Sequence, residues 1–318
     1  MYTTEETYVK SLQLCTMLYL EPITQWITAS SAARLQGVVV MKMIQFYKNI
    51  LQLHTLFLIN LRNRFKSWSE HQKIGDLTIT ITPCLRMYKL YGEDYENMLK
   101  LLDNFKRSSS TYRSIIKEGD NHPLNKLALE SMLILPIQRI PRYVLLIQEL
   151  TKRTENDHPD FVPLTKSLTA LKKTSEDLNT AILQGEKRLK CIEISKLIKW
   201  EDLVVPHRYY INELTLEVNN GKKQEQQRLI IFNDLLLFLS DTPEPVKLDT
   251  ISIDSHLVLK DESETSLILQ SNSSGILKSK TTTTLTFPSE DKKTEFFSML
   301  SKEMKIQEQA NQSRNRKM

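Results

Sequence analysis

The spacing of apolar residues changes once along this chain, near residue 200, and that change restricts the folds it can adopt. Before that point apolar residues recur every three or four positions, which is the period of an amphipathic helix. After it, Leu214, Leu216 and Val218 alternate with polar residues, as in a strand with one buried face. A chain of 318 residues can build two hydrophobic cores. The sequence therefore predicts a helical first domain and a strand-rich second domain.

The first domain is predicted to be a bundle of long helices. The expected helical segments are residues 2–20, 30–66, 93–107, 122–153 and 161–198, with Thr3 or Thr4 as the N-cap of the first. Only 7 glycines occur in the whole chain, which suits long helices and disfavours glycine-rich phosphate loops. A β-branched run within residues 74–91 resembles a strand, but the flanking helices argue against a lone strand there.

The second domain is predicted to contain seven short strands and one closing helix. Asn220-Gly221 and Asn233-Asp234 mark turns between the first strands. Further strands are expected near residues 246–253, 256–260, 265–270 and 275–287, and a helix over 289–306. This order predicts a small β-barrel or sandwich with one end capped by the C-terminal helix. The whole chain is then an α + β multidomain protein.

The stretch 128–153 carries an unusual pattern for a core helix. On a helical wheel, one face is an ordinary apolar stripe formed by Leu129, Leu133, Ile137, Ile140, Val144 and Ile147. The opposite face aligns Ser131, Gln138, Arg142 and Glu149, with apolar residues beside them. Such a mixed stripe is typical of a surface that another macromolecule covers. The wheel also allows a helix buried on all sides, from which Arg142 reaches water through its aliphatic stem.

This same stretch resembles a known family. The run LILPIQRIPRYVLLIQELTKRT resembles the longest motif of the Dbl-homology domain, the exchange-factor domain for Rho-family GTPases. TEETYVKSL resembles the opening motif, and FYKNILQLHTLFLINLRNRF the second motif, whose Leu-His pair matches Leu53 and His54. HRYYINELTLEV followed by RLIIFNDLLLF resembles a pleckstrin-homology domain. The expected domains are residues 1–198 (Dbl-homology) and 199–308 (pleckstrin-homology), with a polar tail over 309–318.

The resemblance implies a guanine nucleotide exchange factor. It would bind the switch regions of a Rho-family small GTPase, displace Mg and GDP, and stabilise the nucleotide-free form so that GTP can load. The implied GTPase contacts are Glu5 on the first switch, Arg142 and Asn179 on the second, and Ser131, Ile134, Leu135, Gln138 and Glu149 on the same surface. The chain departs from the family at Leu135, where Lys is usual, and at Val144, where Pro is usual. His54 is expected to be structural, and Phe296 or Phe297 to replace the usual Trp of the last helix.

Position 134 suggests which GTPase is used. In the resembling family it faces a GTPase residue that is Trp in Rac-type members and smaller in several others. Ile134 presents a broad apolar surface to an indole. We therefore expect a Rac-type partner to be preferred.

Composition argues against several other classes of function. The three cysteines lie far apart, and the six histidines lack the spacing of metal ligands, so neither a disulfide framework nor a metal site is expected. We find no nucleophile, cofactor or nucleotide-binding motif, and we expect neither covalent chemistry nor a cofactor. The polar N-terminus and the absence of a long apolar run favour a cytoplasmic protein.

Charge is divided unevenly along the chain. Residues 1–195 contain 26 basic and 20 acidic residues, a net charge of +6, whereas residues 196–318 contain 17 and 18, a net charge of −1. The basic residues are scattered among acidic ones, so no nucleic-acid partner is expected. Lys222, Lys223 and Arg228 are candidates for weak phosphoinositide binding, with peripheral recruitment to a membrane. Two alternatives remain: a scaffold without exchange activity, and a phosphoinositide-binding membrane adaptor.

Overall fold

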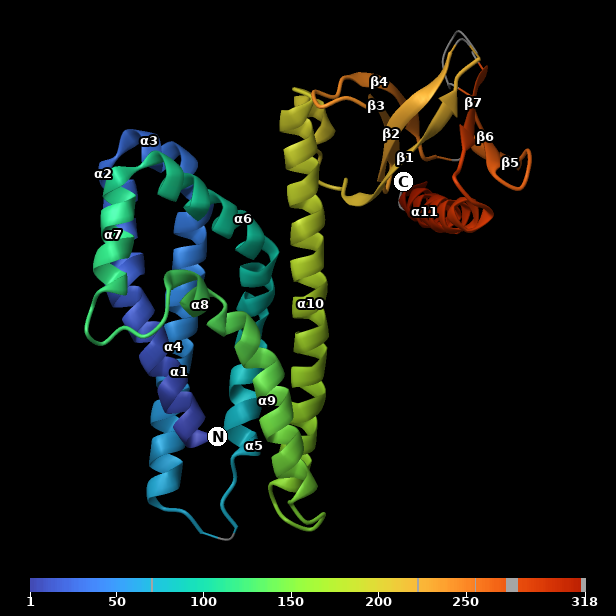
Figure 1. Cartoon of the computed structure of the whole chain (residues 1–318). Coiled ribbons are helices and arrows are strands. Elements are labelled where there is room, and N and C mark those ends of the chain that lie inside the picture. Colours follow the sequence, from blue (N-terminus) through green and yellow to red (C-terminus); the bar gives the residue numbers. More distant parts are fainter. Residues whose placement is uncertain (70, 222, 255, 273–279, 316–318) are drawn as a thin grey trace. The chain divides into compact units, whose positions relative to one another are not determined.

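The computed structural model of this chain divides into two compact units, residues 1–186 and 187–318 (Figure 1). It describes every residue except 70, 222, 255, 273–279 and 316–318. The first unit is helical, and the second contains a seven-stranded sheet and a helix, which confirms the expected fold class. The limit between the units falls inside one long helix, whereas the predicted domain boundary at residue 198 is at the end of that helix. In the described part of the chain, no helix is both long and apolar enough to cross a membrane.

Ten α-helices are described before the sheet. They are α1 (Tyr2–Cys15), α2 (Glu21–Ala29), α3 (Ser31–Gln36), α4 (Val38–Lys66), α5 (Gly75–Ile81), α6 (Arg86–Ser108), α7 (Ser110–Asp120), α8 (Leu129–Leu133), α9 (Leu135–Lys152) and α10 (Phe161–Leu197). A π-helical turn joins α1 to α2, and a 3-10 turn joins α5 to α6. Residues 75–91 are therefore helical, as the argument against a lone strand predicts. Neither Thr3 nor Thr4 caps α1, because the N-cap is Met1 and the Thr4 hydroxyl donates to the Met1 carbonyl (2.8 Å).

One hydrophobic core joins α1, α4, α6, α8, α9 and the first half of α10. Its largest fully buried side chains are tyrosines, and these include Tyr47, Tyr88, Tyr91 and Tyr143. A buried hydroxyl needs a hydrogen-bond partner, so these residues place polar atoms inside the bundle. Two of these hydroxyls, those of Tyr47 and Tyr91, bond backbone carbonyls of a helix that lies far away in the sequence.

The stretch 128–153 is not one helix, because α8 and α9 are separated at Ile134. Pro136 has no N–H to donate to the Met132 carbonyl one turn earlier. The Tyr47 hydroxyl donates to that carbonyl instead (3.2 Å), and the Tyr91 hydroxyl donates to the Leu133 carbonyl (2.7 Å). Two tyrosines from α4 and α6 thus satisfy the carbonyls that the break leaves free. The segment before α8, residues 121–128, is a loop rather than the expected helix.

Helix α10 holds α5 and α6 against the bundle. The buried Asp160, just before α10, accepts hydrogen bonds from the backbone N–H groups of Ile74 (2.8 Å) and Gly75 (2.9 Å) at the start of α5. A Cβ atom at Gly75 would lie 2.7 Å from the Asp160 carboxylate and from the backbone of α10, so only glycine fits there. Further along, a Cβ at Gly185 would lie 2.2 Å from the Glu93 carbonyl on α6. These close approaches fix the path of α10.

The second unit is a fully antiparallel sheet packed against one helix. Its strands are β1 (Tyr210–Asn219), β2 (Gln224–Phe232), β3 (Leu235–Ser240), β4 (Lys247–Ser252), β5 (Leu257–Asp261), β6 (Ser266–Asn272) and β7 (Lys280–Thr286), in the spatial order β4-β3-β2-β1-β7-β6-β5. Helix α11 (Glu290–Asn315) buries Phe296 against Phe287, with ring centroids 5.2 Å apart, whereas Phe297 is exposed. Phe296 therefore takes the core position that we expected of one of the two.

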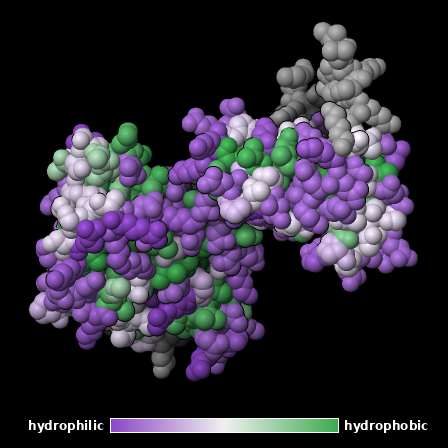
Figure 2. Space-filling view, turned by 45° about the horizontal axis from the view of Figure 1, so that its top comes forward, coloured by the Kyte–Doolittle hydropathy of each residue, from purple (hydrophilic) through white to green (hydrophobic). Residues whose placement is uncertain are grey.

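Helix α11 continues to Asn315, past residue 309, where we predicted a polar tail to begin. No glycine or proline interrupts residues 290–315, so nothing in the sequence stops the helix. On the face that Figure 2 shows, hydrophilic residues cover most of the surface and hydrophobic ones form small separate patches.

Candidate functional site

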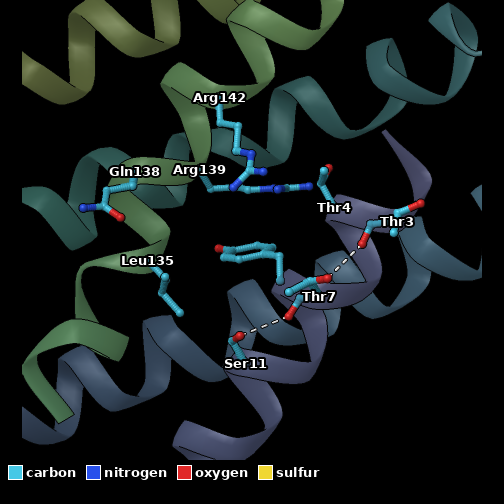
Figure 3. Close-up of a pocket in the computed structure, with 9 residues that line it drawn as sticks. Thr3, Thr4, Thr7, Ser11, Leu135, Gln138, Arg139 and Arg142 are labelled. Atoms are coloured by element: carbon cyan, nitrogen blue, oxygen red, sulfur yellow. Dashed lines mark hydrogen bonds between the residues drawn. The ribbon is translucent and has the colours of Figure 1, made fainter. Parts of the chain in front are cut away.

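A pocket of about 210 Å³ lies between α1 and α9 (Figure 3). Its lining residues are Thr3, Thr4, Thr7, Tyr8 and Ser11 from α1 and Leu135, Gln138, Arg139 and Arg142 from α9. The hydroxyls of Thr4, Thr7 and Ser11 donate to backbone carbonyls one turn earlier in their own helix. With their protons used in this way, the hydroxyl oxygens remain as acceptors. The α1 wall of the pocket is thus rich in hydrogen-bond acceptors.

The α9 wall supplies donors. Leu135, Gln138 and Arg142 follow one another at helical spacing, so they line one stripe of α9. Gln138 and Arg142 are exposed, and Arg142 has no hydrogen bond or ion pair with any residue that the structure describes. A guanidinium and an amide that are free and exposed can donate to carbonyl or carboxylate oxygens of a bound macromolecule.

A charged network lies beneath this pocket. The Glu5 carboxylate is completely buried and accepts hydrogen bonds from the Arg139 guanidinium and the Tyr143 hydroxyl. It also bonds His54 Nδ1 (2.7 Å), while His54 Nε2 lies 2.5 Å from the Tyr88 hydroxyl. Because an ionised carboxylate only accepts, Nδ1 carries a proton and Nε2 can accept from Tyr88. The network therefore joins α1, α4, α6 and α9 through one carboxylate.

Two opposing effects, burial and the polar neighbours, determine the pKa of Glu5. Burial alone would raise the pKa of its carboxyl group, but the hydrogen bond and charge of His54, the charge of Arg139 and the Tyr143 hydroxyl together lower it. Burial and the neighbouring Glu5 carboxylate raise the pKa of Tyr143, so its hydroxyl keeps the proton that it donates. Arg139 lies over two rings, with its guanidinium carbon 4.7 Å from the Tyr8 centroid and 4.4 Å from the Tyr143 centroid. Glu5 and Arg139 are therefore a buried, compensated ion pair.

The structure corrects the expected role of Glu5. Its side chain has no accessible surface, so it cannot accept a hydrogen bond from a bound protein in this conformation. Glu5 lies one helical turn before the buried Tyr8 and faces inward with it, whereas Glu6 is partly exposed and pairs with Arg62. The prediction that His54 is structural is confirmed, because the ring is fully buried and bonded on both nitrogens.

The other predicted contact residues lie on the surface or at its edge. Ser131 on α8, Gln138, Arg142 and Glu149 on α9, and Asn179 on α10 are exposed, whereas Ile134 and Leu135 are half-buried and pack against the core. Glu149 pairs with Lys152 (2.9 Å), and this hydrogen bond lowers the pKa of Glu149. The polar face of the helical wheel is therefore confirmed as solvent-exposed. Its binding role stays a prediction.

Sequence reasoning missed Arg139 as a buried functional residue. It belongs to the Gln-Arg pair of the motif, and it falls on the face of α9 that also buries Ile140 and Tyr143. A charged residue at a position that helical spacing assigns to the core requires a buried partner of opposite charge. The sequence alone therefore indicates that Arg139 needs a buried acidic partner. It does not indicate that this partner is Glu5, 134 positions away.

The second unit contains a separate pocket of about 320 Å³ formed by β1, β2, β3, β4 and β7. Lys223 lines it, together with the carboxylates of Glu225 and Asp249. Arg228, the third candidate for phosphoinositide binding, lies within β2 and is ion-paired with Glu213 on β1. Lys222 lies outside the described residues. The described lining is therefore not predominantly basic.

No group of three or more His, Cys, Asp or Glu side chains in the described part of the chain could hold a metal ion. The three cysteines are free thiols, and burial raises the pKa of Cys191 to about 11. The pocket between α1 and α9 itself is lined by hydroxyls of α1 and by the amide and guanidinium groups of α9.

Comparison with known proteins gives one family and a consistent fold. The sequence model of the RhoGEF domain matches residues 1–179. The chain is 33% identical over 238 residues to "Guanine exchange factor for Rac 30" of Dictyostelium discoideum, and 29% identical over 241 residues to "FYVE, RhoGEF and PH domain-containing protein 4" of Rattus norvegicus. Each match covers 74% of this chain but only 14% and 31% of those longer proteins.

Solved structures show the same architecture. The DH/PH domains of p115-RhoGEF superpose with a TM-score of 0.77 at 15% identity, covering 95% of this chain and 90% of that one. The PDZ-RhoGEF DH/PH domains, solved in complex with GTP-gamma-S-activated RhoA, superpose with a TM-score of 0.73 at 14% identity, covering 96% and 91%. At this identity the likeness concerns the fold: a helical domain followed by a strand-rich domain with a final helix.

Proposed function

Since residues 1–179 match the RhoGEF domain, this chain belongs to the RhoGEF family, and we propose that it is a guanine nucleotide exchange factor for a Rho-family small GTPase. The observation that carries the proposal is the exposed stripe of α9. Gln138 and Arg142 lie on it without a described partner, beside a pocket whose other wall supplies acceptors. Exposed polar residues next to half-buried Ile134 and Leu135 form the mixed surface that protein partners cover.

The proposed activity requires no covalent chemistry. A small GTPase holds its nucleotide through phosphate contacts, Mg²⁺ and two switch loops. A protein that binds the nucleotide-free form more tightly than the loaded form must weaken nucleotide affinity by the same factor, because the two equilibria are linked. Exchange is then faster because GDP and Mg²⁺ leave a distorted site and GTP loads afterwards. The chain acts by differential binding, as a catalyst of release.

Each proposed contact residue has its own role, which depends on its position on the surface. Arg142 donates to carbonyl oxygens of the second switch, and Gln138 extends the same donor stripe. Asn179, exposed on α10, adds side-chain hydrogen bonds. Glu5 is not part of this contact set, since its carboxylate is occupied inside the bundle.

The proposed partner is a Rac-type GTPase. The Dictyostelium relative is named as an exchange factor for Rac, while several solved structures of the same fold are complexes with RhoA. Ile134 is half-buried, so it offers part of a β-branched apolar face to a partner. Such an apolar contact discriminates by only about 1–3 kcal/mol. The preference is therefore partial, and RhoA remains a slower substrate.

The test is nucleotide release measured on a panel of purified Rho-family GTPases loaded with a fluorescent GDP analogue. The expected result is faster release from at least one member, with a Rac-type GTPase ahead of RhoA. Stable binding to GTPases without faster release identifies the scaffold alternative. No binding and no release across the panel rejects the proposal.

A further inference from the structure

Three aromatic rings meet on the surface of the first unit. The Tyr2 ring of α1 lies 5.6 Å from the Phe65 ring near the end of α4, measured between centroids. The Trp68 indole, just beyond α4, stacks on Phe65 with centroids 4.9 Å apart and ring planes 13° apart. Phe65 is 40% exposed and Trp68 is 52% exposed. Exposed apolar side chains that gather in one place mark interaction surfaces, whereas single ones are ordinary. We call these three residues the aromatic edge.

Hydrogen bonds order the chain that presents Trp68. The Gln72 side chain donates to the Ser67 carbonyl (3.0 Å), which closes the connection after α4 around the indole. Arg64, near the end of α4, donates to the Lys73 carbonyl and so holds the far side of the same connection. The rings therefore have a defined position before anything binds. A surface that is ordered in advance loses little conformational entropy on binding.

The sequence around the aromatic edge is basic. Residues 62–73 contain four basic residues and one acidic residue, a net charge of +3. The two arginines among them are ion-paired with carboxylates of α1 and α5. The two lysines, Lys66 and Lys73, are exposed and have no ion pair with any residue that the structure describes. The acidic residue, Glu70, lies outside the described residues. Two ammonium groups without a described counter-charge thus accompany the exposed rings.

We propose that the aromatic edge, together with Lys66 and Lys73, is a docking surface for an anionic lipid bilayer. Tyr and Trp side chains have an apolar body and a polar tip, which suits the headgroup level of a membrane. Lysine side chains beside them are attracted by the negative potential of anionic lipids. Binding of a protein to a membrane surface strengthens with buried apolar area and with charge attraction, and this surface offers both. The inference goes beyond the proposed function and does not depend on it.

The size and the position of this surface favour a bilayer over a protein partner. A specific protein interface buries about 800 Å² on each partner. At their exposed fractions, Phe65 and Trp68 offer on the order of 200 Å² of ring surface, which is far less. Figure 1 shows the end of α4 and its connection to α5 at one end of the first unit. Side chains at such an end can enter the headgroup layer of a flat bilayer.

Attachment at this surface would also place the candidate site. Tyr2 directly precedes Thr3, which lines the pocket between α1 and α9. A chain docked through the aromatic edge would therefore hold that pocket close to the bilayer.

The first arm of the test measures binding of the whole chain to vesicles by co-sedimentation. Vesicles of phosphatidylcholine with phosphatidylserine should retain the chain, and vesicles of phosphatidylcholine alone should retain little. The double variant Phe65→Ser with Trp68→Ser should bind the phosphatidylserine vesicles at least about tenfold more weakly. Phe297→Ser is the control, because Phe297 on α11 is also 40% exposed, and it should bind as the parent does. Parental binding by the double serine variant would overturn the proposal.

The second arm tests whether the position of the charge matters. Lys66→Glu with Lys73→Glu should weaken binding to phosphatidylserine vesicles at least about tenfold. Lys106→Glu with Lys117→Glu changes the net charge equally at exposed positions of α6 and α7, and it should weaken binding by less than about threefold. Equal losses in the two variants would show attraction by the net charge of the chain and overturn the docking surface.

The third arm measures insertion of the indole itself. In parent chain bound to phosphatidylserine vesicles, phospholipids brominated on their acyl chains should quench the tryptophan fluorescence. Trp68→Phe keeps an aromatic ring and should still bind, but most of the quenching should disappear, since only Trp26 and Trp200 remain. Undiminished quenching in Trp68→Phe would overturn the proposal. This conservative variant also decides the question if the double serine variant does not fold.

A protein partner at the same surface predicts a different result. Nucleotide release in solution, without vesicles, should be the same for the double serine variant as for the parent. If release in solution is slowed while vesicle binding is unchanged, the aromatic edge contacts the GTPase and the proposal is overturned. If no GTPase responds to the parent but the three lipid arms give the expected results, the proposed function fails and the docking surface is supported.

Discussion

Arg139 and Arg142 lie three residues apart on α9, but they have different environments and therefore different roles. Arg139 is buried, bonded to Glu5 and stacked between two tyrosine rings. Arg142 is exposed, with no partner in the described part of the chain. One helical turn therefore separates a cation compensated inside the protein from a cation available to another molecule. Substitutions at the two positions should therefore have different effects on stability and on exchange.

Reversing the charge at Arg142 should affect exchange and spare stability. Arg142→Glu is expected to slow nucleotide release at least about tenfold, because it removes donors and repels acceptor oxygens. The melting temperature should hardly change, since exposed substitutions usually alter stability by about 0.5 kcal/mol or less. Asn179→Ala should act in the same direction. Lys117→Glu, an exposed charge reversal on α7, is the control and should release nucleotide at the parental rate. A folded Arg142→Glu protein with unchanged release would exclude Arg142 from the contact surface.

Removing the Glu5 charge should destabilise the protein in a pH-dependent way. The folded-state pKa of Glu5 lies below its ordinary value of 4.5, so its stabilising contribution is complete above that value and is lost as pH falls through the lowered folded pKa. Glu5→Gln leaves Arg139 buried without a counter-charge, which costs about 3 kcal/mol at neutral pH. The difference in unfolding free energy between parent and variant should therefore shrink on acidification below 4.5. Urea titrations across a pH series measure it, and a constant difference would contradict the network.

At the scale of elements, the junction between α8 and α9 determines where the contact surface lies. Pro136 breaks the helix, and the two carbonyls freed by the break are bonded by tyrosines from α4 and α6. Ser131 lies before the junction, and Gln138 and Arg142 lie after it. The relative direction of these side chains is thus set by contacts with other helices. A continuous helix would have directed them differently.

The hydroxyl of Tyr91 should contribute measurably to stability through this junction. Tyr91→Phe leaves the buried Leu133 carbonyl without its donor, an expected loss of about 1–3 kcal/mol. Tyr47→Phe should cost a similar or smaller amount, since its bond to Met132 is longer. Tyr112→Phe is a matched control, because Tyr112 is buried but its hydroxyl bonds no described residue, and it should cost less. Thermal unfolding followed by far-UV circular dichroism distinguishes these outcomes. Equal losses in all three variants would show that the carbonyl bonds do not matter.

At the scale of the whole molecule, charge is not shared equally. The excess of positive charge lies in residues 1–195, whereas residues 196–318 have a net charge of −1. In the second unit, Glu225 and Asp249 line the same pocket as Lys223, and Arg228 is neutralised by Glu213. Attraction of residues 196–318 to an anionic membrane should accordingly be weak.

We therefore expect no phosphoinositide-specific recruitment of the chain. In co-sedimentation with liposomes, vesicles containing phosphoinositide should retain no more protein than vesicles of equal charge made with phosphatidylserine. Raising the salt concentration should release what binds, because screening weakens non-specific attraction. Tight binding that requires the phosphoinositide and is abolished by Lys223→Glu would contradict this expectation and favour the membrane-adaptor alternative.

The sequence by itself determined the division into helices and strands, the order of the elements and the exposed face of α9. These properties follow from the spacing of apolar residues within one or two turns, which each stretch carries locally. Only the tertiary structure decided that Glu5 faces inward, that its partners are His54 and Arg139, and that the Tyr47 hydroxyl replaces the missing donor of Pro136. Those partners are 49 to 134 positions apart. Contacts at that separation depend on how the helices pack. The local spacing of apolar residues does not indicate which distant side chains will be in contact.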